Sequence, residues 1–246
     1  MKLEKAYKLL ALQEDISNRT AKDLIDRGVV YSNGKKVVVA RGEMSVDSKF
    51  KIEKIEKIRV LFEDDKIMAV DKPAFVTSEE VSKEKGYPLV HRLDRETSGV
   101  LILSKDEAFR KKAVEAFKAR EVKKEYIAVV EGRLIEDIVI NSPILTVKKG
   151  NVAHSRISDL GKEAISRVEP LMYESKKSKI KITIDTGRTH QIRVHLKSIA
   201  APIQGDVQYG GRPFKRMMLH AQRIVFMGYN IVSGEPDDFK KFASIS

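Results

Sequence analysis

The sequence predicts an α+β protein in two parts, a small module over residues 1–54 and a larger domain over residues 58–246. Short helical patterns and one hairpin signal occupy the first part. A charged stretch over residues 51–57 is typical of a linker that passes into a strand. In the second part, apolar and alternating strand patterns outnumber the helical ones. The 246 residues, 42% of them hydrophobic, suffice for a small domain and a medium one with a sizeable core.

Composition narrows the function classes. Lysine and arginine number 47 against 35 aspartates and glutamates, and the net charge of +12 favours nucleic acid as a partner. A basic protein without such a partner has the same composition. The absence of cysteine excludes disulfides and thiolate zinc sites and fits the reducing cytoplasm. The chain start lacks a signal-peptide core, and no run approaches the roughly 20 apolar residues of a membrane span, so we expect no membrane partner.

The first part is expected to hold two short helices and a hairpin. Thr20 and Asp23 form a capping-box pattern that predicts the start of the second helix, and Gly28 is suited to end it. The dipeptide Asn33-Gly34 between two β-prone runs is a strong hairpin signal, and the second strand of that hairpin is expected over residues 37–39.

Basic side chains gather around the second helix and the hairpin; they are Arg19, Lys22, Arg27, Lys35 and Lys36. Two helices followed by a small sheet resemble the S4 RNA-binding domain, and the matching stretches are residues 18–20, 24–28 and 33–35. The resemblance implies an S4-like α/β module in which Arg19, Lys22, Arg27 and Lys35 bind RNA. The alternative is a small α/β appendage whose lysines face water.

The stretch that carries the chemistry is His91-Arg92-Leu93-Asp94-Arg95-Glu96-Thr97-Ser98-Gly99, a polar loop followed by a buried strand over residues 100–104. It sets Asp94 between the guanidinium groups of Arg92 and Arg95, and the opposite charge favours an ionised carboxylate. An ionised aspartate on a loop held by a rigid strand can act as a nucleophile or a base. Taken alone, Arg-Leu-Asp-Arg is typical of a surface loop with an ordinary ion pair.

The whole string resembles the signature of the RluA-type RNA pseudouridine synthases. Lys124-x-Tyr126, at the head of a strand expected over residues 125–132, resembles the second motif of that family. Residues 186–196, a turn leading into a helix, resemble the third motif. The resemblance implies that residues 58–246 form an α+β catalytic domain with a mixed, mainly antiparallel central sheet. Asp94 is expected on the floor of a cleft across that sheet.

The resemblance also implies the reaction and its residues. Uridine in RNA is detached from its sugar at N1, rotated and rejoined through C5. Asp94 is the essential carboxylate, which either attacks C1′ or removes a proton to form a glycal. Tyr126 is expected to stack on the uracil, and Arg188 to pair with Asp94 and keep it ionised. An isomerisation needs neither redox chemistry nor hydrolysis, so no cofactor and no metal are implied.

Arg92 is expected to take the place of the extruded base, and Lys123 and Lys124 are expected to contact RNA. Other polar residues are given plain structural roles. Lys72, before a proline, is expected to be solvated. His190 and His195 lack the spacing of a zinc site, and a structural role at the helix start is favoured.

Several functions stay open at this point. Because the module resembles that of relatives acting on large-subunit ribosomal RNA, we expect that target, with transfer RNA as the alternative. A non-catalytic RNA-binding protein would explain the charge but not the three motifs. A glycosidase usually needs a second carboxylate, and no equally framed one is present. We expect a monomer in the cytoplasm.

Overall fold

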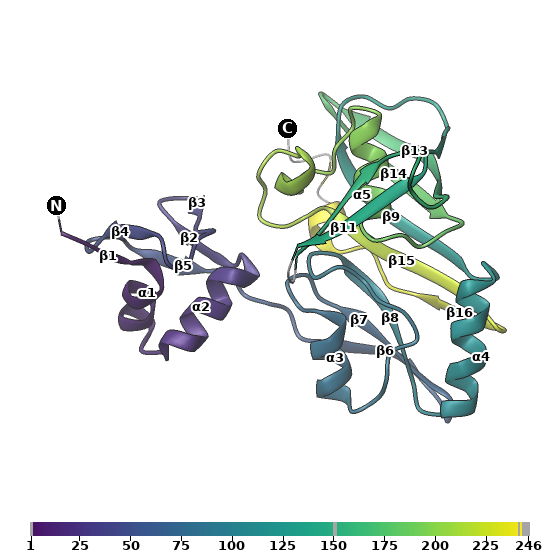
Figure 1. Cartoon of the computed structure of the whole chain (residues 1–246), viewed down its shortest axis with the longest axis horizontal. Helices are drawn as coiled ribbons and strands as arrows, with labels where there is room; N and C mark the ends of the chain where they lie inside the picture. Colours follow the sequence, from purple (N-terminus) through teal and green to yellow (C-terminus); the bar gives the residue numbers. More distant parts are fainter. Residues whose placement is uncertain (1, 150–151, 241, 243–246) are drawn as a thin grey trace. The chain divides into compact units, whose positions relative to one another are not determined.

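A computed structural model describes residues 2–149, 152–240 and 242, and the chain divides into two compact units, Met1–Lys57 and Ile58–Ser246 (Figure 1). The division falls at the end of the charged stretch, residues 51–57, where little apolar surface is available for packing. None of the described helices is long and apolar enough to span a membrane.

Over its described residues, 2–57, the first unit contains two helices and two small sheets. Its elements are β1 (Leu3–Lys5), α1 (Ala6–Glu14), α2 (Asn18–Arg27), β2 (Val30–Ser32), β3 (Lys35–Lys36), β4 (Glu43–Ser45) and β5 (Phe50–Ile52). Strand β1 pairs with β4, and the other sheet has the order β3-β2-β5. Leu10, Ile25 and Phe50 are buried in its core.

The start of α2 differs from the expected one. Ser17, not Thr20, is the N-cap residue, because its hydroxyl accepts a hydrogen bond from the Thr20 backbone N–H at 3.0 Å. The helix therefore begins two residues before Thr20. Its end agrees with the prediction, since Gly28 adopts the left-handed conformation with φ 75°.

The predicted hairpin is present, but its second strand is shorter than expected. Asn33 and Gly34 both have positive φ, as a tight two-residue turn requires. The strand that follows is confined to Lys35–Lys36. The prediction of a strand over residues 37–39 is wrong. Val38 and Val39 are 71% and 58% exposed, so little packing is available to hold them in a sheet.

The second unit is built on one mixed sheet of nine strands. Its order is β10-β13-β14-β9-β15-β8-β7-β6, with β16 pairing with β15. Strands β8 and β15 pair in parallel, and the other recorded pairs of this sheet are antiparallel. This confirms the predicted α+β class with a mixed, mainly antiparallel sheet. The elements are β6 (Arg59–Glu63), β7 (Ile67–Lys72), α3 (Ser78–Lys85), β8 (Ser98–Ser104), α4 (Glu107–Lys118), β9 (Lys123–Glu131), β10 (Ile138–Asn141), β11 (Ile144–Lys149), β12 (Val152–Ile157), β13 (Ile165–Glu174), β14 (Lys177–Ile184), α5 (Gln191–Ser198), the 3₁₀ turn η1 (Val207–Tyr209), β15 (Leu219–Phe226), β16 (Tyr229–Val232) and α6 (Asp237–Lys240).

Strand β8 is buried along its whole length, which explains its continuous apolar sequence. Leu101 and Leu103 belong to the larger core cluster. Val100 and Ile102 point to the opposite face and pack in a second cluster that includes residues of α4. Because both faces of the strand are packed, the loop that precedes it has a rigid support.

Gly99, at the start of β8, is required by a close approach of two backbones. Its φ is 114°, and a Cβ atom there would lie 2.2 Å from the carbonyl oxygen of Ala221 on β15. Only glycine lets the two strands pair at this point, where the loop that carries Asp94 enters the sheet.

One hairpin was not predicted from the sequence. Strands β11 and β12 pair antiparallel and form a two-stranded sheet apart from the main one. The turn between them, residues 150–151, lies outside the described residues. His154 of β12 is exposed, and the centre of its ring lies 5.5 Å from that of Tyr209.

Candidate active site

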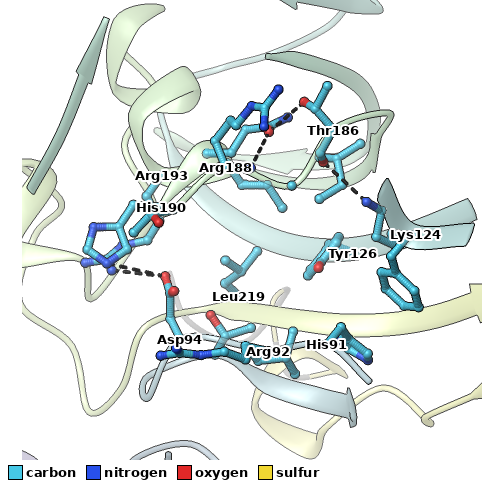
Figure 2. A pocket seen from close by; sticks show the side chains of 18 of the residues that line it. His91, Arg92, Asp94, Lys124, Tyr126, Thr186, Arg188, His190, Arg193 and Leu219 are labelled. Carbon is cyan, nitrogen blue, oxygen red and sulfur yellow. Dashed lines mark hydrogen bonds and ion pairs between the residues drawn. The ribbon is translucent and has the colours of Figure 1, made fainter. Parts of the chain in front are cut away.

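A cleft of ≈ 1110 Å³ lies in the second unit, where the loop before β8 faces the start of α5. Strand β9 and the first residue of β15 contribute Tyr126 and Leu219. Figure 2 shows these two side chains in the middle of the cleft, Asp94 beside His190 and Arg193, and Lys124 on the opposite side. Residues of all three predicted motifs thus line one cavity.

Asp94 is held through one of its two carboxylate oxygens. Arg193 Nη1 donates to Asp94 Oδ2 at 3.2 Å, and His190 Nε2 lies 3.9 Å from the same oxygen (Figure 2). Among the described residues, Asp94 Oδ1 has no hydrogen-bond partner. One oxygen is therefore oriented by the protein, while the other is available to a substrate.

Arg193 is a buried cation with four recorded hydrogen bonds, three of them to carboxylate oxygens. Its side chain is 5% exposed, and its Nε and Nη2 donate to the two carboxylate oxygens of Asp206, each at 2.8 Å. Nη2 also donates to Gln208 Oε1 at 2.9 Å. Burial lowers the pKa of Arg193, but the hydrogen bonds and charge of Asp206 more than offset this and hold the pKa above its ordinary value. The guanidinium group is thus a fixed positive charge beside Asp94.

The expectation that Arg188 pairs with Asp94 is wrong. Arg188 lines the cleft, but its Nε donates to the Glu163 carbonyl at 2.9 Å. It lies in the turn before α5, where its own backbone N–H donates to Gln191 Oε1. Arg193 is one helical turn beyond His190, and helical spacing was the signal that could have identified it.

The sequence also predicted that the guanidinium group of Arg92 lies beside Asp94, and this prediction is wrong. Its Nε lies 3.0 Å from Glu79, and its side chain is 73% exposed at the cleft. Although Arg92 is only two residues from Asp94 in sequence, its partner comes from α3, whereas Asp94 is paired with Arg193 of α5.

Tyr126 has the placement that the sequence predicted. It lies on β9 opposite Ile182 on one side and Ala221 on the other, is 8% exposed and lines the cleft. Burial raises the pKa of the Tyr126 phenol above its ordinary value, and the charge of Asp94 raises it further. The side chain is therefore a neutral aromatic group in the wall of the cleft.

The predicted RNA-binding lysines of β9 differ in their surroundings. Lys124 is 9% exposed, lines the cleft, and its Nζ lies 3.4 Å from the Thr186 carbonyl and 5.9 Å from the centre of the Phe117 ring. Burial lowers the pKa of Lys124. Lys123 points away from the cleft lining and pairs with Glu125 at 2.6 Å.

The basic residues expected to bind RNA in the first unit are all present on α2 and the hairpin. Arg19 and Lys35 are exposed. Lys22 lies over the ring of Tyr7, at 4.2 Å from its centre, and Arg27 pairs with Asp23 at 2.6 Å.

Lys72 is not the solvated lysine that was expected. It is 0% exposed, and its Nζ donates to the carbonyls of Pro73, Val76 and Arg95 at 2.9, 2.6 and 3.1 Å. Burial lowers the pKa of Lys72 to about 7, although the charges of Glu96 and Asp94 oppose the shift. An ammonium group has three N–H donors, so its three carbonyl partners match it and join the loop after β7 to the loop of Asp94.

The two histidines of the third motif have separate roles. His195 is buried and structural, as expected, with Nδ1 2.9 Å from Ser166 Oγ and Nε2 3.0 Å from the Ser142 carbonyl. His190 instead faces Asp94 from the start of α5. It has a left-handed backbone with φ 54°, a conformation that costs a non-glycine residue about 1–3 kcal/mol.

Comparison with known proteins decides the family. Residues 67–198, more than half of the chain, match the RNA pseudouridylate synthase family. The chain belongs to this family. The match includes Asp94, Tyr126, Arg188 and Arg193, and it confirms the resemblance that the sequence motifs carried. The protein is therefore an RNA pseudouridine synthase, an isomerase, and neither a glycosidase nor a non-catalytic RNA-binding protein.

Relatives agree with this membership. An uncharacterised RNA pseudouridine synthase of Helicobacter pylori J99 is 50% identical over 242 residues, which cover 97% of this synthase and 100% of the relative. The ribosomal large subunit pseudouridine synthase D of Pasteurella multocida is 28% identical and covers 87% of this synthase and 80% of its own length. The structure of human RNA Pseudouridylate Synthase Domain Containing 1 matches with a TM-score of 0.65 and 28% identity, over 77% of this synthase and 87% of that chain.

Substitution of Lys72 by methionine should destabilise the synthase and loosen the loop that carries Asp94. The variant leaves three carbonyls without their donor, so we expect the free energy of unfolding to fall by about 1–3 kcal/mol. Because the Arg95 carbonyl belongs to the Asp94 loop, we also expect the single-turnover rate to fall about 10-fold or more. Urea unfolding and pseudouridine formation measure the two effects. Lys83→Met on the exposed side of α3 is the control. Equal unfolding free energies and equal rates in the two variants would contradict the role given to the three hydrogen bonds of Lys72.

Proposed function

We propose that the synthase converts a uridine of large-subunit ribosomal RNA to pseudouridine, with Asp94 as the essential carboxylate. The observation that carries this proposal is the geometry of Asp94. Its Oδ2 is held by a buried arginine, and its Oδ1 is open to a cleft that Tyr126 lines. This arrangement suits a group that must react with a sugar while a base lies beside it.

Two routes use the open oxygen. In the first, Oδ1 bonds to C1′ as the N1–C1′ bond breaks and its electron pair passes to the uracil; C5 of the rotated uracil then attacks C1′ and displaces the carboxylate. In the second, Asp94 takes the C2′ proton as N1 leaves, and it returns that proton when the C5–C1′ bond forms. Both routes end with loss of the C5 proton and protonation of N1.

Tyr126 supplies the surface on which the uracil rests. Stacking of a base on an aromatic side chain stabilises binding by about 1–3 kcal/mol. The neighbouring lining is apolar and includes Ile184, Ile192 and Leu219. Because burial raises the pKa of Tyr126, its phenol stays neutral and does not repel an anionic uracil.

Arg92 is proposed to fill the space that the extruded base leaves in the RNA. Extrusion costs a few kcal/mol of stacking, so a replacement for the lost contacts favours it. Arg92 is suited to this because its partner in the free protein is one exposed glutamate, Glu79, and exposed ion pairs contribute only about 0–1 kcal/mol. It can therefore leave that partner at little cost.

Phosphates are proposed to follow the basic rim of the cleft. Lys118, Arg120, Lys124 and Arg188 all line it. Lys123 lies on the same strand as Lys124 and extends the basic surface away from the cleft. Backbone contacts of this kind position an RNA without reading its sequence.

Large-subunit ribosomal RNA is favoured over transfer RNA by two observations. A relative that aligns with 87% of this synthase is a ribosomal large subunit pseudouridine synthase D. The first unit adds a second basic surface, and two tethered sites gain effective concentration on a target large enough to engage both. We propose that this unit is an S4-like RNA-binding module and that the enzyme acts as a monomer in the cytoplasm.

Replacement of Asp94 by asparagine should abolish pseudouridine formation and leave RNA affinity nearly unchanged. The change keeps the shape of the side chain but removes its negative charge and its nucleophilic oxygen. The readouts are pseudouridine content after incubation with total RNA, and the dissociation constant from a filter-binding titration. Asp137→Asn, on an exposed loop, is the matched control. Turnover above about 1% of wild type in Asp94→Asn would exclude the proposed role.

A map of pseudouridines tests the RNA target. We expect RNA from cells without the protein to lack one or more pseudouridines of large-subunit ribosomal RNA, and the purified enzyme to restore them. The Asp94→Asn variant serves as the negative control in the restoration. If the missing sites were confined to transfer RNA, the ribosomal assignment would be wrong while the reaction would stand.

The role of the first unit predicts a change in the salt dependence of binding. Each lost phosphate contact reduces the slope of log affinity against log salt by about 0.7–0.9. The double variant Arg19→Ala, Lys35→Ala should therefore bind more weakly at low salt and show a flatter slope. Lys49→Ala with Lys54→Ala removes the same charge elsewhere in the unit. Identical slopes for the two double variants would refute a specific RNA surface on α2 and the hairpin.

A further inference from the structure

A chain of polar contacts reaches Asp94 from the β11–β12 hairpin. The backbone N–H of Ser155 donates to the Tyr209 hydroxyl at 3.0 Å. The same hydroxyl lies 2.8 Å from His190 Nδ1, and His190 Nε2 lies 3.9 Å from Asp94 Oδ2. Strand β12, η1 and the start of α5 thus converge on one side of the carboxylate.

These contacts determine the tautomer of His190. Tyr209 is 1% exposed, and burial raises the pKa of its phenol, so it keeps its proton. Its oxygen already accepts from Ser155, and among the described residues His190 Nδ1 is the acceptor within reach of its O–H. Because buried donors are nearly always satisfied, Nδ1 accepts this proton and Nε2 carries the imidazole hydrogen. That N–H faces Asp94.

The imidazole of His190 does not cap the N-terminus of α5. His190 occupies the N-cap position of α5, where serine, threonine or aspartate are usual, yet its side chain makes no capping hydrogen bond. The side chain of Gln191 provides the hydrogen bonds at the start of the helix instead, since its Oε1 accepts from the Arg188 backbone N–H and from Thr186 Oγ1. A histidine with φ 54° that does not cap is explained by what its ring contacts, namely Tyr209 and the space beside Asp94.

We propose that His190 is a positioning residue for Asp94, which presents Nε2–H to Oδ2 so that, together with Arg193, it leaves Oδ1 directed at the uridine. The inference rests on the proposed role of Asp94. The gap of 3.9 Å is longer than a hydrogen bond and closes with a small movement of the carboxylate toward α5. A donor on Oδ2 stabilises the anion, both before Asp94 reacts and when the carboxylate is released.

Two substitutions separate this role from a purely structural one. The amide of glutamine reaches the place of Nε2, so His190→Gln keeps a donor toward Asp94 and loses the acceptor for Tyr209. The amide oxygen of asparagine occupies the place of Nδ1, so His190→Asn keeps the Tyr209 partner and loses the donor. Asparagine also tolerates a left-handed backbone, so the Asn variant is expected to melt no lower than wild type.

The measurement is the single-turnover rate of pseudouridine formation at saturating enzyme, with total RNA from cells that lack the protein. We expect His190→Asn to lower the rate about 10–100-fold, the effect of one hydrogen bond to a charged group. His190→Gln should stay within about 3-fold of wild type on the same grounds, and both should bind RNA with unchanged affinity. An unchanged rate in His190→Asn, or a Gln variant slower than the Asn variant, would overturn the proposal.

A second readout does not depend on turnover. Long-range ¹H–¹⁵N spectra of the full-length protein report which ring nitrogen of a histidine carries the proton. We expect the Nε2–H tautomer at His190 in the wild type and a loss of that preference in Tyr209→Phe. An Nδ1–H tautomer would overturn the inference. If the wild type formed no pseudouridine in any RNA, the proposed function would fail, and the spectra would still decide the orientation of His190.

Discussion

The buried guanidinium of Arg193 is the interaction on which the rest of the site depends. A cation with a 5% exposed side chain must be neutralised nearby, because an unpaired charge in the interior costs several kcal/mol. Asp206 does this through two hydrogen bonds, and Asp94, 99 residues earlier in the chain, adds a second negative charge. Neutralising one arginine therefore brings together α5, the segment before η1 and the loop before β8. The Asp94 carboxylate is oriented as a result of this requirement.

The loop of Asp94 is restrained from two other directions. Gly99 lets β8 approach β15, so the end of the loop enters a strand that is packed on both faces. Lys72 holds the Arg95 carbonyl, one residue from Asp94, together with two carbonyls of the loop after β7. Backbone and side chain of the same short loop are thus fixed by separate interactions. This restricts the freedom of Asp94 before any RNA is bound, and it lowers the entropy cost of reaching a reactive geometry.

Much of the fold could be predicted from local sequence patterns, whereas the side chains that pair with one another in the cleft could not. The continuous apolar run after Gly99 predicted β8, because a strand packed on both faces needs such a run. The pairing with Asp94 was assigned to Arg188, which lies in the turn before α5, whereas Arg193, one helical turn beyond His190, makes it. Lys72 was misread because its three acceptors include Arg95, 23 residues away in sequence. The β11–β12 hairpin was not predicted from the sequence. The hydrogen bond from the Ser155 backbone N–H to the Tyr209 hydroxyl, which depends on that hairpin, was therefore not predicted either.

The cleft divides two tasks between its sides. Asp94, His190 and Arg193 form a charged side that, in the proposed reaction, orients and reacts with a sugar, while Tyr126 and Leu219 offer apolar contacts that can hold a base without a fixed hydrogen bond (Figure 2). Such contacts have a consequence for an isomerisation in which the base must turn from N1 to C5. Stacking holds the uracil in its plane but resists rotation within that plane only weakly. In the proposed reaction the charged side keeps C1′ beside Asp94, so the base can turn while the sugar stays in place.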